Sequence, residues 1–167
     1  MGTAITAIIT MTEAPTSALL RLMTWLSPAF PVGAFAYSHG LERAIEERKV
    51  RDRASLIAWL EVLLQRGSAW NDAVLLAEFW REISATGSCE EVAELAEAMA
   101  GSRERHMETM LQGEAFDTAI ASWSDEADDA GSRIAYPIAV GKAAAEHGVQ
   151  LEDALAAYLH AFASNLI

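Results

Sequence analysis

His39 and Glu42 are the first side chains whose types and spacing could do chemistry. A histidine and a carboxylate three residues apart lie on one face of a helix, and both can bind a transition metal. Two ligands do not complete a metal site, and the other histidines are scattered along the chain at positions 106, 147 and 160. We therefore interpret the pair as packed or solvated side chains and expect no metal site and no cofactor. A direct metal-ion carrier that uses the four histidines stays open as an alternative.

The acidic run at Asp125, Glu126, Asp128 and Asp129 is a second candidate, because carboxylates bind magnesium. No second acidic cluster matches it, and the neighbouring Gly131 favours a solvated loop. The chain also has no Gly-Lys-Ser/Thr phosphate loop, no Gly-x-Ser-x-Gly elbow and no His-Glu-x-x-His motif. We expect that the protein is not an enzyme, and keep an all-helical metal-dependent enzyme as the alternative.

The composition excludes several classes of partner. The chain has 167 residues with 24 acidic and 12 basic side chains, which gives a net charge of −12. Nucleic-acid phosphates would be repelled by this charge, so we expect no nucleic-acid partner. No apolar run approaches the roughly 18 residues of a membrane-spanning helix, so we expect no membrane partner. Cys89 is the single cysteine, which excludes an intramolecular disulfide and fits a reducing cytoplasm.

The stretch from Ser27 to Glu42 combines a stiff backbone with small residues and aromatic rings. Its prolines fix the backbone and remove amide donors, and its glycines permit sharp turns. These residues are Pro28, Phe30, Pro31, Gly33, Phe35, Tyr37 and Gly40. The stretch either connects two helices as a buried turn or presents side chains to a partner. The lack of a catalytic constellation elsewhere favours the second interpretation.

Helical periodicity predicts an all-α fold, a single-domain bundle of about seven to eight helices over residues 16–167. We expect residues 1–15 to be disordered. Apolar positions and caps place the helices at about 16–26, 38–48, 53–66, 72–84, 89–99, 102–123, 134–147 and 151–167. Asp52 is the expected N-cap of the third, and Ser88 with Glu91 forms an expected capping box. The expected buried positions include Leu41, Ile45, Met107, Met110 and Leu111.

Three motifs in order resemble the UreF family of urease accessory proteins. The first is Ser27-Pro-Ala-Phe-Pro-Val-Gly-Ala-Phe-Ala-Tyr-Ser-His-Gly-Leu-Glu42. The second is Ala135-Tyr-Pro-Ile-Ala-Val-Gly141, and the third is Ala157-Tyr-Leu159 followed by Ser164-Asn165. The likeness spans about Leu19 to Ile167.

This resemblance implies a non-catalytic chaperone that forms a homodimer in the cytoplasm. It implies a complex with UreD/UreH and then with the GTPase UreG, in which GTP hydrolysis is coupled to nickel insertion into apo-urease. Nickel binding is implied for that assembly rather than for identified residues of this chain. Members of the family continue beyond the Ser164-Asn165 motif, so we expect residues 16–167 to lack a C-terminal helix and tail. An exposed face with Tyr158 and Phe162 would follow.

The resemblance also assigns partner-binding residues by motif. Phe30 to Tyr37 is expected to pack inward, and Ser38 to Glu42 to open a helix whose outer face meets the partner. Glu42 is the strongest candidate, because the helical pattern places this carboxylate outside, where it could meet a basic patch on the GTPase. The full set is Phe30, Pro31, Gly33, Tyr37, Ser38, Gly40, Leu41, Glu42, Ser164 and Asn165.

Overall fold

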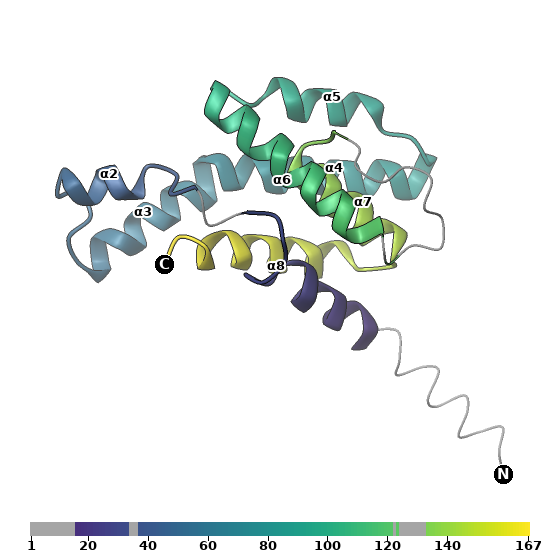
Figure 1. Ribbon diagram of the computed structural model, residues 1–167, viewed down its shortest axis with the longest axis horizontal. Helices are drawn as coiled ribbons and strands as arrows, with labels where there is room; N and C mark the ends of the chain where they lie inside the picture. The colour runs from purple at the N-terminus through teal and green to yellow at the C-terminus, as the bar shows by residue number, and fades with distance from the viewer. Residues whose placement is uncertain (1–15, 34–36, 122, 124–132) are drawn as a thin grey trace, which may run out of the picture.

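The computed structural model describes residues 16–33, 37–121, 123 and 133–167. Residues 1–15, expected to be disordered, lie outside this part, and so do Phe35 and the acidic run at 125–129. Every regular element in the described part is helical, which confirms the all-α prediction (Figure 1). A helical stretch covers residues 16–25. It is followed by α2 (Leu41–Glu46), α3 (Arg53–Arg66), α4 (Ser68–Thr86), α5 (Glu90–Ala98), α6 (Arg103–Ala121), α7 (Tyr136–Glu146) and α8 (Leu151–Ser164).

The helix boundaries confirm some predicted caps and correct others. Asp52 caps α3 as predicted, with its carboxylate accepting from the Ser55 amide at 2.9 Å. The helix expected from residue 72 begins at Ser68, because Gly67 alone separates α3 from α4. The predicted Ser88–Glu91 capping box is wrong, since the N-cap of α5 is Cys89. Ser88 instead belongs to the turn after Gly87, where its carbonyl accepts from the Thr86 hydroxyl at 2.7 Å.

The main core forms around α7, which packs against α4 and α6. Small residues on α7 permit this approach, since a Cβ at Gly141 would lie 3.2 Å from the carbonyl oxygen of Leu76 on α4. Two large rings fill the core, because Trp25 is 1% exposed and Phe116 is fully buried. Their centroids lie 6.4 Å apart in an edge-to-face arrangement. The residues around Trp25 therefore belong to the same hydrophobic core as α6 and α7.

The helices α2 and α3 extend away from this core at one end of the molecule (Figure 1). They share a smaller apolar cluster in which Leu41 and Ala44 pack with Leu166, at the end of the chain. Ile45 was expected on the inner face of α2, but 52% of it is exposed. The contact uses positions three residues apart, Leu41 and Ala44, so Ile45 points outward.

The buried face of α6 is largely polar, and this overturns the expected burial of Met107 and Leu111. These two side chains are 47% and 53% exposed, whereas Met110 is buried as expected. The inner face instead carries Glu108, Thr109, Gln112 and Asp117 together with Gly113, Phe116 and Ile120. Hydrophobic periodicity therefore assigns the wrong face to part of this helix.

Two rings of α8 also differ from expectation. Tyr158 is only 4% exposed, and Phe162 is half-buried, so the expected exposed aromatic face is wrong. Tyr158 packs against Tyr136 of α7, with ring centroids 5.5 Å apart. Within the described ranges, no helix combines the length and the hydropathy that crossing a membrane requires.

Candidate functional site

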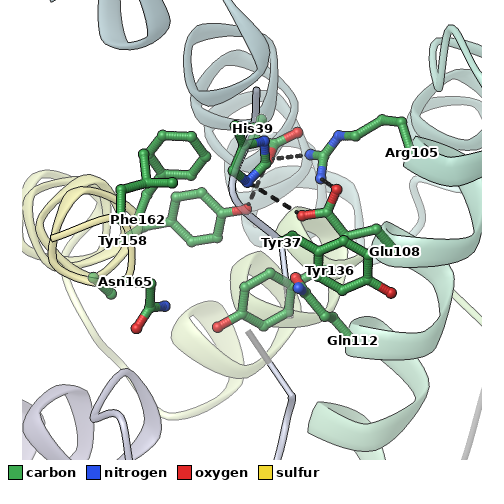
Figure 2. Close-up of a pocket in the computed structure, with 12 residues that line it drawn as sticks. Tyr37, His39, Arg105, Glu108, Gln112, Tyr136, Tyr158, Phe162 and Asn165 are labelled. Carbon is green, nitrogen blue, oxygen red and sulfur yellow. Dashed lines mark hydrogen bonds and ion pairs between the residues drawn. The ribbon is translucent and has the colours of Figure 1, made fainter. Parts of the chain in front are cut away.

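Glu108 of α6 is the centre of a buried group of charged side chains (Figure 2). One of its carboxylate oxygens, Oε1, lies 3.3 Å from His39 Nε2. The other, Oε2, lies 3.0 Å from Arg105 Nη1, one helical turn earlier on α6. Glu108 therefore joins the Ser27–Glu42 stretch, through His39, to the helical bundle.

Arg105 extends the group toward α4 and α8. Its second nitrogen, Nη2, lies 2.5 Å from Asp72 Oδ2 on α4. The phenol of Tyr158 on α8 donates to the same Asp72 oxygen across 3.0 Å. We call His39, Asp72, Arg105, Glu108 and Tyr158 the buried polar network. It connects one loop and three helices.

Burial sets the electrostatics of this network. Desolvation raises the pKa of Asp72 even though Arg105 and Tyr158 oppose that rise. Desolvation acts in the same direction on Glu108, but hydrogen bonds and charge from His39 and Arg105 outweigh it and lower the pKa of that carboxyl. For Arg105, desolvation disfavours the charged form, yet Asp72 and Glu108 raise the pKa of the guanidinium. One guanidinium thus faces two carboxylates, so removal of Arg105 leaves two buried acidic groups without their shared cation.

His39 is held by three helices in addition to its own loop. Its Nδ1 lies 3.3 Å from Ser68 Oγ at the start of α4, and its Nε2 faces Glu108 of α6. Its ring centroid lies 4.7 Å from that of Phe162 on α8. The His39–Glu42 metal pair considered from the sequence does not form one helical face, because His39 precedes α2 and Glu42 is exposed on its first turn.

A cavity of about 310 Å³ is lined in part by Asp72 and Arg105, and a second cavity beside the network is too small for a substrate. This smaller cavity has a volume of about 30 Å³ and is lined by the network together with Tyr37, Gln112 and Asn165. That volume is enough for one water-sized group. No group of three or more potential His, Cys, Asp or Glu metal ligands exists in the part of the chain that the structure describes. The charged groups of the network are paired to each other, and these pairs connect the loop at His39 with α4 and α6.

The structure brings some of the motif residues to this site and leaves others away from it. Tyr37 and Asn165 line the smaller cavity, and Leu41 is buried in the α2–α3 cluster. Phe30 packs on Phe116 of the main core, with centroids 5.4 Å apart, as expected for the inward part of the stretch. Ser164 is exposed, and its hydroxyl lies 3.5 Å from His160 Nε2.

The remaining motif residues shape the backbone or face solvent. Gly33 and Gly40 have φ angles of 71° and 79°, which glycine adopts without strain. The carbonyl of Ser38 accepts from the Leu41 amide at 2.9 Å at the start of α2. Pro31 is exposed before this turn. The expectation that Phe30 to Tyr37 packs inward is therefore only partly met, because Pro31 and Gly33 are exposed whereas Phe30 is half-buried.

Sequence reasoning missed Asp72, Arg105, Glu108, Gln112 and Tyr136. A signal for three of them was present, because positions 105, 108 and 112 recur at intervals of three and four residues. The same stripe continues through Phe116 and Ile120, which are buried. A polar stripe in line with buried apolar positions indicates buried charge pairing.

The fold and site define an all-helical protein, in which paired buried charges hold a partly exposed loop and helix against the bundle. Comparison with known proteins agrees, since the family model of UreF matches residues 50–167. The chain is 59% identical over 163 residues to urease accessory protein UreF 1 of Brucella abortus, covering 97% of this chain and 72% of the relative. It is 57% identical over 159 residues to urease accessory protein UreF of Mesorhizobium japonicum, covering 94% and 71% respectively.

The chain belongs to the UreF family. A match that covers 97% of the chain extends over the Ser27–Glu42 stretch, which lies before the residues that the family model matches. The resemblance inferred from the motifs is confirmed. Membership of this family assigns the chain to the accessory proteins of urease rather than to enzymes.

Proposed function

We propose that this chain acts in urease maturation as a scaffold for nickel delivery. In this proposal it binds UreD/UreH and the GTPase UreG in the cytoplasm, and it couples GTP hydrolysis to insertion of nickel into apo-urease. The observation that carries the proposal is the 59% identity to a urease accessory protein UreF over 97% of the chain. Residues 16–167 would work as one domain and pair with a second copy as a homodimer.

The outer face of α2 is the proposed contact with the GTPase. Glu42 and Glu46 are both exposed on this helix, and they lie four residues apart on one side. Leu41 and Ala44 anchor the opposite side in an apolar cluster with Leu166. Arg43 is also exposed on α2 and pairs with Glu47 at 2.8 Å. The two carboxylates of Glu42 and Glu46 on a helix held from the other side suit docking to a basic surface. The chain's net charge of −12 favours the same kind of partner.

Reconstitution from purified proteins tests this function. The chain, UreD/UreH and UreG are mixed with and without guanine nucleotide and separated by size-exclusion chromatography. Co-elution of the chain with UreD/UreH, and of UreG with that complex, is the expected result. Absence of both complexes under every nucleotide condition would contradict the proposal. Addition of apo-urease and nickel then gives the functional readout, which is urease activity that depends on this chain.

A further inference from the structure

We propose that His39 is a positioning residue that sets the orientation of α2, and through it the placement of Glu42 against the GTPase. This inference rests on the proposed function of the α2 face. His39 itself is half-buried and points into the bundle, so it need not touch the partner. Its effect on binding would pass through the backbone of the two residues between His39 and Glu42, which are Gly40 and Leu41.

The backbone at His39 has an uncommon conformation, and its side chain is held by several contacts. His39 has a φ of 47°, in the left-handed region that a non-glycine residue seldom adopts. The next residue, Gly40, has a φ of 79°. Arg48 shares this conformation, with a φ of 56°, although it is exposed. His39 differs because its ring contacts Ser68, Glu108 and Phe162, and these contacts hold the side chain against the bundle.

The N-terminus of α2 makes few other stabilising contacts. The helix α2 has 6 residues, and its N-cap, Gly40, provides no side-chain hydrogen bond. A helix this short is unstable by itself, so its formation and direction depend on tertiary contacts. Leu41 and Ala44 supply apolar contacts along one side. His39 supplies the polar attachment immediately before the first turn.

The partner of His39 is itself rigidly held. Glu108 is bound on its second oxygen by Arg105, which in turn binds Asp72 of α4. Asp72 also accepts from Tyr158 of α8. A hydrogen bond restricts the loop more strongly when its partner is such a fixed carboxylate than when its partner is a mobile surface side chain. The buried polar network therefore fixes the position of His39, the residue from which the backbone leads into α2.

Two substitutions separate this role from a general effect on folding. His39→Ala removes the polar contacts and the ring, whereas His39→Gln keeps a side-chain donor that can reach Glu108. His106→Ala is the matched control, because His106 is a half-buried histidine that pairs with Glu97 at 2.9 Å and lies outside the network. Hydrogen exchange is measured by mass spectrometry on the whole chain, alongside the affinity of purified UreG for the complex with UreD/UreH.

In His39→Ala, the amides of Ala44 in α2 and of Glu47 at its C-cap should exchange at least about tenfold faster than in the parent protein. The amides of Ala139 in α7 and of His147 at its C-cap should not change. UreG affinity should fall about tenfold, and His39→Gln should restore most of both effects. His106→Ala should match the parent chain.

Unchanged exchange in α2, or a glutamine variant as impaired as the alanine variant, would overturn the inference. So would faster exchange in α7 as well, since that would show a general loss of structure. The proposed function fails separately. If Glu42→Ala weakens UreG binding and His39→Ala does not, the positioning role alone is wrong, whereas if Glu42→Ala also has no effect, the α2 face itself is not the docking surface.

Discussion

The phenol of Tyr158 donates a hydrogen bond to Asp72 Oδ2 across 3.0 Å, and so joins α8 to α4 in the interior. Both residues are nearly inaccessible, with 4% and 6% of their surfaces exposed. The same carboxylate oxygen also accepts from Arg105. Removal of either donor therefore leaves the desolvated carboxylate of Asp72 with one hydrogen-bond donor fewer, which should lower the stability of the protein.

Tyr158→Phe should lower the free energy of unfolding by about 1–2 kcal/mol, because Asp72 loses one of its donors while the ring stays in place. Urea unfolding followed by circular dichroism measures this change. Tyr136→Phe is the matched control, since the phenol oxygen of Tyr136 makes no hydrogen bond within the part of the chain that the structure describes. Equal stability losses in the two variants would show that the bond to Asp72 is not the cause.

Arg105→Ala should be more damaging, at about 3–5 kcal/mol, because Asp72 and Glu108 would remain buried without their shared cation. Arg105→Lys should lose less, since the charge stays but the two-pronged geometry is lost. Arg81→Ala removes an exposed pair with Glu78 and should change stability by no more than about 1 kcal/mol. A loss in Arg105→Ala as small as that of the exposed pair would contradict the role assigned to the network.

Acid should destabilise the protein in part through Glu108. The pKa of this carboxyl lies below its ordinary value of 4.5 in the folded state, so its stabilising contribution is present above that value and is lost as the pH falls through the folded-state pKa. Glu108→Gln removes this contribution. We expect the unfolding free energy of the variant to fall less steeply than that of the parent below pH 4.5, in urea titrations at several pH values.

Asp72 should contribute to the pH dependence of the unfolding free energy with the opposite sign to Glu108. Its pKa is raised above 3.8, so the folded state holds the proton more tightly and stability from this group is lost as the pH rises through the folded-state pKa. Asp72→Asn should therefore make acid destabilisation steeper than in the parent protein. A pH dependence of stability that is parallel in the parent and both variants would contradict these pKa directions.

Gly113→Ala should disrupt the contact between α6 and the start of α7. An added Cβ would lie 1.8 Å from the carbonyl oxygen of Ile134, which is backbone and cannot rotate away. Overpacking of this kind costs about 1–3 kcal/mol or more, beyond any gain in helix propensity. Gly101→Ala, with open space around the added carbon, should stay within about 0.5 kcal/mol of the parent. Similar thermal midpoints for both variants would show that the helices can separate without cost.

The sequence predicts the helices well because their signals are local. Asp52 as an N-cap depends on its own side chain and on Ser55, and the small residues of α7 show directly that a neighbour can approach. The inner face of α6 is different. Whether Glu108 points inward depends on Arg105 beside it and on Asp72, which lies 33 residues away from Arg105. Such pairing is a property of the folded chain, and hydrophobic periodicity cannot report it.

The sequence predicts only part of the candidate site, because some of its residues are marked by a local motif and others by contacts between distant segments. The motif from Ser27 to Glu42 could be recognised as a resemblance, and the structure separates its packed rings from its exposed carboxylate. The sequence does not predict the contact of His39, because its spacing from Glu42 indicates only a possible metal-binding pair on a helix. Its contact is with Glu108, 69 residues along the chain, so only the folded arrangement reveals it.

The affinity of UreG for the complex of UreD/UreH with the Glu42→Ala variant tests the central claim most directly. Glu61→Ala is the control, because Glu61 is an exposed acidic residue on the neighbouring helix α3. If the outer face of α2 docks the GTPase, Glu42→Ala should weaken binding at least about tenfold, or about 1.4 kcal/mol, without loss of helicity. The control should leave the affinity unchanged. Unchanged affinity in Glu42→Ala, or an equal loss in both variants, would contradict the claim.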